Sequence, residues 1–232
     1  MRRLEIIAVE GLPEVRPGDR LAPMVAACAA LVDGDVVVVT QKVVSKAEGR
    51  MVAVDPDDPA AYAAVVAAES VRVLRRRGDL VISETASGFV CANAGIDRSN
   101  VPDGYVTLLP VDADRSARRI RDGLRAAPGV EVGVIVSDTF GRTWRQGVTD
   151  VAIGCAGIAA ILDLRGTSDA LGRPLEVTEV AVADELASAA ELVMGKATGV
   201  AAAVIRGVDP SWFRDASVRA EIVRPPAEDL FR

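Results

Sequence analysis

The stretch VIVSDTFGRTWRQGVTD, Val134 to Asp150, joins an apolar run to a dense set of polar and charged side chains. Its β-branched beginning, residues 134–136, is typical of a buried strand. Asp138 and Thr139 follow where this strand is expected to leave the sheet, and ligands gather at such strand ends in open α/β sheets. With Arg142 and Arg145 behind them, they suit a metal ion and a phosphate. A capped turn with a solvated basic face explains the same residues, so this stretch alone leaves both interpretations open.

The composition limits the possible functions. The chain has 232 residues, a hydrophobic content of 50% and a net charge of -6. The acidic balance argues against a nucleic-acid partner, which needs a basic face. The absence of histidine excludes Ser-His-Asp and Cys-His catalysis and histidine-based metal sites. Any catalysis must therefore use carboxylates, hydroxyls, lysines, arginines and an added metal.

The N-terminus and the cysteines indicate the cellular environment. The apolar run in MRRLEIIAVEG is too short for a signal peptide, and no uncharged apolar run reaches the roughly 18 residues of a membrane span. We therefore expect no membrane partner and a cytoplasmic location. Cys28, Cys91 and Cys155 form no CxxC motif and lie in apolar surroundings, which predicts buried thiols.

The hydrophobic pattern predicts a mixture of strands and helices in one domain, residues 1–232. Strands are expected at residues 4–9, 36–39, 80–82, 88–91, 105–109, 134–136, 175–180 and 201–205. Helices are expected at residues 21–31, 62–77 and 116–126, with Asp112 or Asp114 as the N-cap of the last, and from about residue 180 through Met194, with Gly195 as the C-cap. The arginines at 75–77 are interpreted as the basic end of the helix 62–77. Residues 208–232 are expected to be an irregular tail.

Five polar clusters accompany these elements, at residues 11–14, 41–46, 97–100, 138–150 and 194–199. Together they supply the oxygen ligands that Mg²⁺ or Mn²⁺ prefers and the basic groups that neutralise phosphates. For any one cluster alone, an ordinary loop is the favoured explanation. Two familiar nucleotide motifs are absent: MGKATG lacks the Walker A pattern, because Ala197 follows Lys196 and Ala190 occupies the upstream glycine position, and there is no GxGxxG.

Taken together, the clusters resemble the F420-0:gamma-glutamyl ligase family. The matching segments appear in the family's order over roughly residues 4–207: VEGLPEVRPGD, DGDVVVVTQKVVSKAEGR, NAGIDRSNV, LLPVDADRSA, SDTFGRTWRQGVTDVAIGCAGI and EVAVADELASAAELVMGK. RQGVTD and the tail RPPAEDLF look most similar to the N-terminal ligase domain of the actinobacterial two-domain enzyme, in which a nitroreductase-like flavin domain follows. The chain is then either a stand-alone version or an excerpt.

The resemblance implies an α+β fold with a mixed sheet and an intertwined homodimer. It also implies a reaction in which GTP drives amide formation between the lactyl carboxylate of F420-0 and L-glutamate, through an acyl phosphate, with later glutamates added by γ-linkage. Mg²⁺ or Mn²⁺ is the implied metal, and K⁺ is a further candidate. Positioning and charge neutralisation carry most of phosphoryl transfer, which suits a site without histidine.

The family roles transfer to this sequence motif by motif. The residues matching nucleotide contacts are Leu12, Pro13, Glu14, Val15, Gln41, Lys42, Lys46, Asn100, Met194, Gly195, Lys196, Ala197, Thr198, Gly199, Val200 and Ala201. Lys46 is the expected phosphate partner, and Asp97 and Asp138 match metal-binding aspartates. Thr139 matches a ligand of a second metal. No family role transfers to Arg142 and Arg145, which we expect to anchor an acidic substrate beside the catalytic Lys46 and Asp138.

Lys196 departs from the pattern of the archaeal members, in which an acidic residue expected to help hold the second metal stands at this position. A protonated lysine cannot ligate a divalent cation, so the second metal site is expected to be weak or absent. The ammonium either replaces part of that cation's charge or points to solvent. At the level of the whole chain, two alternatives also stay open: another metal-dependent nucleotide ligase or kinase, and a non-catalytic GTP-binding module that serves a separate flavoprotein.

Overall fold

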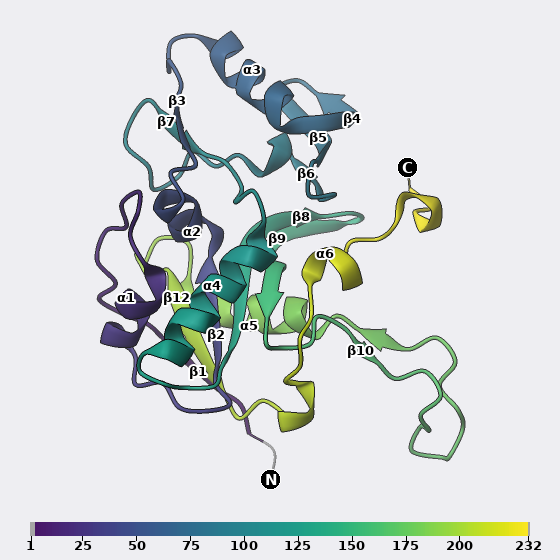
Figure 1. Cartoon of the computed structure of the whole chain (residues 1–232). Coiled ribbons are helices and arrows are strands. Elements are labelled where there is room, and N and C mark those ends of the chain that lie inside the picture. Colours follow the sequence, from purple (N-terminus) through teal and green to yellow (C-terminus); the bar gives the residue numbers. More distant parts are fainter. Residues whose placement is uncertain (1–2, 232) are drawn as a thin grey trace.

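The computed structural model describes residues 3–231 and centres on a five-stranded mixed sheet (Figure 1). The sheet order is β1 (Glu5–Ala8), β12 (Ala202–Arg206), β2 (Val36–Thr40), β8 (Gly133–Arg142) and β9 (Arg145–Ala156). Strands β2 and β8 run parallel, whereas the other neighbours pair antiparallel. The carboxyl ends of β2 and β8 therefore meet at one edge of the sheet.

Helices cover both faces of this sheet, which explains the unbroken valine run of β2. One face packs against α1 (Leu21–Cys28) and α4 (Ala113–Ala126), and the other against α5 (Val182–Met194). Val37 and Val39 belong to the first core, whereas Val36 and Val38 belong to the second. All four are fully buried, because successive side chains of a strand point to opposite faces.

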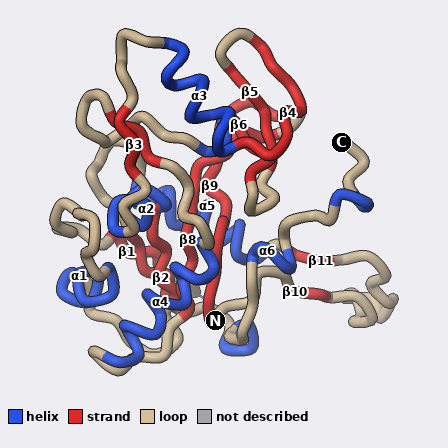
Figure 2. Tube along the Cα trace, turned by 45° about the horizontal axis from the view of Figure 1, so that its top comes forward, coloured by secondary structure: helices blue, strands red, loops and turns tan. Residues whose placement is uncertain are grey.

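A smaller lobe, residues 51–107, sits above the strand ends (Figures 1 and 2). It contains β3 (Met51–Ala53), α3 (Pro59–Glu69), β4 (Ser70–Arg77), β5 (Leu80–Thr85), β6 (Val90–Ala92), the 3₁₀ turn η1 (Asn93–Gly95) and β7 (Tyr105–Thr107). Strands β4, β5 and β6 form one sheet, and β3 pairs with β7. The lobe has its own core, which includes Val66, Val81 and Val106. We call residues 51–107 the upper lobe.

The remaining elements either connect the central sheet to the upper lobe or lie outside both. Helix α2 (Gln41–Ala47) follows β2 directly. Strands β10 (Leu162–Asp163) and β11 (Glu179–Val180) form the base of an arm that projects from the body in Figure 1. The last part of the chain contains η2 (Pro210–Trp212), α6 (Val218–Glu221) and η3 (Pro226–Glu228).

The main error of the sequence prediction is the helix at residues 62–77. Helix α3 begins at Pro59, with Asp58 as its N-cap, and ends at Glu69, where the chain becomes strand β4. Residues 70–73 alternate polar and β-branched side chains, and residues 70–77 pair with β5 from Ser70↔Thr85 to Arg77↔Leu80. Pairing with a neighbouring strand therefore outweighs the helix pattern. The arginines at 75–77 lie on an exposed strand and are not the end of a helix.

Four smaller predictions also need correction. The strand at 134–136 extends to Arg142 and returns as β9, so Asp138 and Thr139 lie within a hairpin and not in a capped turn. The helix at 21–31 ends at Cys28. Of the strand at 175–180, only Glu179 and Val180 are in strand conformation. The tail is partly regular, because the N-terminus of α6 docks on Asp114, whose carboxylate accepts bonds from Val218 N (2.9 Å) and Ser217 Oγ (2.7 Å).

Several other predictions are confirmed. Strands β1, β2 and β12 and helix α4 lie where the sequence pattern placed them, and Asp112 caps α4 by accepting a hydrogen bond from Arg115 N at 2.8 Å. Gly195 ends α5 with a φ of 62°. Cys91 and Cys155 are buried, and burial raises the pKa of each thiol to about 12. Cys28 is only half-buried, so the prediction of a buried thiol is wrong for this residue. Among residues 3–231, no helix is long and apolar enough to cross a membrane.

Candidate active site

The site lies at the carboxyl ends of the two parallel strands. Thr40 of β2 pairs with Ser137 of β8. The next residue in the chain is polar in both cases: Gln41 follows Thr40, and Asp138 follows Ser137. Beyond Ser137, β8 loses β2 as a partner and pairs only with β9. Asp138 therefore stays in the five-stranded sheet, paired with Val151 of β9, and the expectation that the strand leaves the sheet at Asp138 is wrong. A cavity of about 350 Å³ opens here, and we call it the strand-end cavity.

Segments far apart in the sequence converge on the strand-end cavity. The predicted site residues that line it are Leu12, Pro13, Glu14, Val15, Gln41, Lys42, Lys46, Asn100, Asp138, Thr139, Met194, Gly195, Lys196, Gly199, Val200 and Ala201. They come from the loop after β1, from α2, from the loop after η1, from β8 and from the loop between α5 and β12. The sheet order explains this, because β1, β12, β2 and β8 are neighbours and their connections meet at one edge.

Some predicted site residues lie elsewhere. Ala197 and Thr198 belong to the same loop but do not line the cavity, and the Thr198 hydroxyl bonds to the Met194 carbonyl oxygen. Arg142 and Arg145 are exposed at the tip of the β8–β9 hairpin, where they pair with each other in the strand register. Arg142 donates to the carbonyl oxygen of Gln146 at 2.7 Å. Within one copy of the described chain, these two arginines do not line the strand-end cavity.

Lys46 points its ammonium group at the loop after β1. The residue is only 8% exposed, and its Nζ lies 2.6 Å from Oε1 of Glu14. Glu14 itself is largely exposed, with 74% of its side chain accessible. Moving the exposed Glu14 carboxylate away from the lysine costs little free energy, because water can solvate it, whereas the buried lysine is held in place. The ammonium can therefore exchange Glu14 for another anion that enters the cavity.

Lys42 joins α2 to the loop that carries Asp97. Its Nζ lies 2.8 Å from Oδ2 of Asp97 and 2.6 Å from Oγ of Ser99. Burial acts to raise the pKa of the Asp97 carboxyl, but the hydrogen bonds from Lys42 and Ser99 outweigh it, and the net pKa lies below its usual value. Asp97 is therefore ionised at neutral pH. It does not line the strand-end cavity itself but is joined to it by the ion pair with Lys42, which does.

Asp138 is the electrostatically unfavourable group of the site. Burial raises the pKa of its carboxyl to about 7, and the negative charges of Asp97 and Asp150 add to that increase. A bond from the Thr139 backbone and the charge of Lys42 act in the opposite direction but compensate only in part. The ionised form of Asp138 therefore lacks a full counter-charge in the chain itself.

Asp150 is a central residue that the sequence prediction missed. It is 3% exposed, and its carboxylate accepts hydrogen bonds from Ser137 Oγ (3.1 Å), Thr139 Oγ1 (2.7 Å) and Lys196 Nζ (2.6 Å). The hairpin register explains this position, because Thr139 stands opposite Asp150. The signal was present in the sequence: the Asp-Thr of β8 is matched by a Thr-Asp on the returning strand.

Lys196 points into the site and not to solvent. Its Nζ contacts Asp150 Oδ1 at 2.6 Å, Thr139 Oγ1 at 2.7 Å and Glu191 Oε1 at 3.2 Å. Burial acts to lower the pKa of the ammonium, but bonds and charges from Asp150 and Glu191 outweigh it and raise the pKa above its usual value. Of the two possibilities for Lys196, the solvent-facing one is wrong. Glu191, one turn before the end of α5, is a second cavity residue that the prediction missed.

Gln41 presents an unmatched acceptor in the wall of the cavity. Its Nε2 donates to the Leu108 carbonyl oxygen (2.9 Å) and to Ser45 Oγ (2.8 Å). The Ser45 hydroxyl in turn donates its hydrogen bond to the same Leu108 carbonyl oxygen. Turning the amide round would set two oxygens against each other, so this orientation is fixed. Its Oε1 is buried and, within residues 3–231, has no hydrogen-bond partner. Such a group needs a donor, a water or a cation.

Comparison with known proteins identifies the family. The sequence profile of the family described as F420-0:Gamma-glutamyl ligase matches residues 11–207. The chain is 44% identical over 252 residues to the coenzyme F420:L-glutamate ligase of Methanopyrus kandleri, covering 100% of both chains. It is 43% identical to the protein of the same name from Methanothermobacter thermautotrophicus, covering 99% of each chain. A third relative of that name, from Haloarcula marismortui, is 41% identical over 99% of this chain and 96% of its own.

The matched region contains the segments that converge on the strand-end cavity and all five polar clusters singled out in the sequence. Its end, at residue 207, agrees with the end expected from the motifs. The match is distributed over the central sheet and the upper lobe alike. The chain therefore belongs to the F420-0:gamma-glutamyl ligase family.

Proposed function

We propose that this protein ligates L-glutamate to the lactyl carboxylate of F420-0 at the expense of GTP, and adds further glutamates by γ-linkage. One observation carries the proposal: the segments that resemble the family's nucleotide and metal motifs converge on the strand-end cavity. The names of the relatives, coenzyme F420:L-glutamate ligase, support the acceptor and the amino acid.

Lys46 and Lys42 are the proposed phosphate-binding groups. Both ammonium groups are held by acids that a ligand can replace, because Glu14 is exposed and Asp97 is only partly buried. A triphosphate entering the cavity meets two preplaced positive charges, which bind phosphate oxygens more strongly than neutral donors do. Glu14 is then released to solvent, and Asp97 is freed from Lys42.

The residues fit a hard divalent cation. Asp138 lacks a full counter-charge, and Asp97 acts on it electrostatically, so a cation held by these two carboxylates relieves the unfavourable charge. Among residues 3–231, no three acidic or cysteine side chains already form a metal cluster, which agrees with Asp97 being held by Lys42. When bound, Mg²⁺ or Mn²⁺ supplies charge neutralisation on the phosphates.

Lys196 is the proposed built-in cation of the cavity wall. Its ammonium contacts Thr139, which was expected to bind a second metal, together with Asp150 and Glu191. A fixed positive charge among these oxygens does part of the work of a second ion and leaves one divalent cation for Asp97 and Asp138. The K⁺ named as a further candidate has a possible ligand in the unmatched Oε1 of Gln41.

The proposed chemistry has two steps. A carboxylate oxygen of the acceptor attacks the γ-phosphorus, the bond to the β-phosphate oxygen breaks, and GDP leaves. The α-amine of glutamate then attacks the acyl carbon of the mixed anhydride, the C–O bond to phosphate breaks, and inorganic phosphate and one proton are released. The chain holds the reactants in line and supplies positive charge where the phosphoryl group transfers, which accounts for most of the rate enhancement in this reaction class.

A homodimer is part of the proposal. Several large apolar side chains are exposed: Trp144 and Val148 on the β8–β9 hairpin, Leu171 and Val177 on the arm, and Leu192 on α5. Exposed apolar surface of this kind marks interaction sites, and the family resemblance supplies a second copy as the partner. Arg142 and Arg145 lie on the same hairpin, so their proposed role as anchors for an acidic substrate requires the dimer.

Phosphate release tests this function against its alternatives. With GTP, Mg²⁺, F420-0 and L-glutamate together, we expect phosphate release that falls to background when either F420-0 or glutamate is omitted. Release that needs an acid other than F420-0 indicates a different ligase or kinase. Binding of GTP without any release under these conditions indicates a binding module and contradicts the proposed function.

A further inference from the structure

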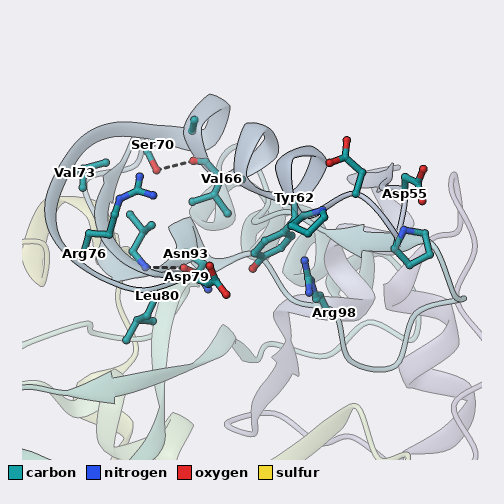
Figure 3. Close-up of a pocket in the computed structure, with 16 residues that line it drawn as sticks. Asp55, Tyr62, Val66, Ser70, Val73, Arg76, Asp79, Leu80, Asn93 and Arg98 are labelled. Atoms are coloured by element: carbon teal, nitrogen blue, oxygen red, sulfur yellow. Dashed lines mark hydrogen bonds between the residues drawn. The ribbon is translucent and has the colours of Figure 1, made fainter.

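A second cavity, of about 560 Å³, lies in the upper lobe between α3 and the strands β4 and β5 (Figure 3). Its wall is apolar where Val66 and Val81 contribute, and its edge carries Tyr62, Arg76 and Arg98. The volume is within the usual range of small-molecule sites, about 300–1,000 Å³. We call this space the upper cavity. None of the roles assigned to the strand-end cavity uses it.

Tyr62 and Arg98 form a flat platform at the edge of the upper cavity. The Arg98 guanidinium lies 3.5 Å from the centre of the Tyr62 ring. The Asn93 side chain donates a hydrogen bond to the Tyr62 hydroxyl oxygen, and Oδ1 of Asn93 accepts a bond from Val81 N at 2.9 Å. These contacts fix the platform. Guanidinium planes stack on flat rings and also bind anionic oxygens.

The charges around the upper cavity define what it can accept. Within residues 3–231, neither Arg76 nor Arg98 forms an ion pair, so both are available to a ligand. Asp55, Asp58 and Asp79 also line the cavity. Their negative charge disfavours a polyanion such as a second triphosphate, whereas their oxygens accept hydrogen bonds from hydroxyl groups. The ligand that fits is a flat, hydroxyl-bearing molecule with one anionic linkage.

One short loop connects this cavity to the strand-end cavity. Asp97 is held by Lys42 of α2 at 2.8 Å, and Asn100 lines the strand-end cavity. Arg98, between them in the chain, lines the upper cavity. The two cavities therefore share the loop 97–100, and an elongated molecule on this loop can occupy both.

We propose that the upper cavity binds the ring end of the acceptor, a hydroxyl-bearing deazaflavin with one phosphodiester, while the acceptor's carboxylate reaches the strand-end cavity. The Tyr62–Arg98 platform stacks on the ring, Arg98 donates hydrogen bonds to the phosphodiester oxygens, and the aspartates accept hydrogen bonds from the hydroxyl groups. The inference rests on the proposed function, because it names where that function's acceptor lies. It adds a specificity site that is separate from the groups that bind GTP.

Binding of F420-0, followed by its own deazaflavin fluorescence, tests this inference on the full chain. Arg98→Ala removes the platform, and Ala63→Trp fills the cavity from α3. The matched controls are Arg75→Ala, on the exposed strand β4, and Ala64→Trp, the next residue of α3; neither control residue lines the cavity. Thermal unfolding of each variant verifies that it is folded. The KM for GTP is measured in parallel.

We expect Arg98→Ala and Ala63→Trp each to raise the Kd for F420-0 about tenfold or more, the size of a lost charge-assisted contact. The KM for GTP and both control variants should stay within about twofold of the parent. If the parent ligates glutamate but F420-0 affinity is unchanged in Arg98→Ala and in a folded Ala63→Trp, the acceptor binds elsewhere and the inference is overturned. A parent that binds F420-0 but forms no product instead overturns the proposed function, and a Kd that still rises only in the two cavity variants then supports the binding site by itself.

Discussion

Two lysine–aspartate pairs have their lysines in the wall of the strand-end cavity, and they differ in how firmly each is held. Lys42 meets Asp97 at 2.8 Å on a loop where both side chains are partly accessible. Lys196 meets Asp150 at 2.6 Å, and that carboxylate is almost completely buried and also bound by Ser137 and Thr139. An accessible pair exchanges partners readily. Half of the Lys196 side chain is exposed, but the side chain of its partner Asp150 is only 4% exposed, so loss of the lysine leaves a buried carboxylate without its cation. We therefore propose that Lys42 leaves Asp97 when a divalent cation binds that carboxylate, whereas Lys196 stays bound to Asp150 as a permanent cation.

The largest effect is expected at Asp138, the acid between the two pairs. Asp138→Asn removes a carboxylate from the proposed cation site, and ligation should fall about 100-fold or more, since such ions contribute several kcal/mol to phosphoryl transfer. Asp97→Asn should behave similarly. Steady-state rates of phosphate release measure the loss, with the exposed Asp122→Asn on α4 as the control. Normal turnover in Asp138→Asn would exclude it from metal binding.

The next effect concerns Lys46 and its exposed partner. Lys46→Met removes a proposed phosphate contact, so the GTP concentration at half-maximal rate should rise about 10- to 150-fold, the value of a charge-assisted bond. Glu14→Gln should leave that concentration unchanged or lower it, because the carboxylate competes with phosphate for the lysine. If Lys46→Met depends on GTP as the parent does, Lys46 binds only Glu14.

A direct comparison of the two pairs comes from Lys42→Ala and Lys196→Ala. Loss of the permanent cation should lower turnover about tenfold, and added Mg²⁺ should restore it only in part, because Asp150 lies in a buried position shaped for an ammonium. Loss of Lys42 should have a smaller effect that Mg²⁺ compensates more fully. The measurement is phosphate release against Mg²⁺ concentration. Equal behaviour of the two variants would contradict the distinction, and parental behaviour of Lys196→Ala would exclude charge replacement.

The last effect concerns the stability of the metal-free protein and not its turnover. The pKa of Asp138 is raised to about 7 in the folded chain from its ordinary value of 3.8, so folding resists ionisation and stability declines as pH rises between these values. A shift from 3.8 to about 7 corresponds to about 4 kcal/mol at 1.36 kcal/mol for each pKa unit, so Asp138→Asn should stabilise the metal-free protein at pH 8 by up to that amount. The gain should vanish near pH 4. Urea unfolding at both pH values, in a chelator, measures it; an equal effect at both would show that charge is not the cause.

How far the sequence could predict the molecule depends on whether the signal was local. The valine runs of β2 and β8 predicted a buried sheet, because unbroken apolar side chains indicate burial on both faces. The resemblance to the family motifs identified most of the residues that line the strand-end cavity. Asp150 was missed because its position depends on the hairpin register, which brings it opposite Thr139. Strand β4 was taken as a helix because only its pairing with β5 separates the two possibilities. The contact of Lys196 likewise depends on a turn at Gly195 that aims the loop inward.

The central claim is GTP-dependent ligation, and the mass of the product tests it most directly. The parent protein is incubated with F420-0, L-glutamate, Mg²⁺ and either GTP or ATP, and the deazaflavin products are analysed by mass spectrometry. The account predicts products heavier than F420-0 by one or more glutamyl residues, formed with GTP and absent without a nucleotide. Recovery of F420-0 unchanged, from protein that binds GTP and is correctly folded, would contradict it.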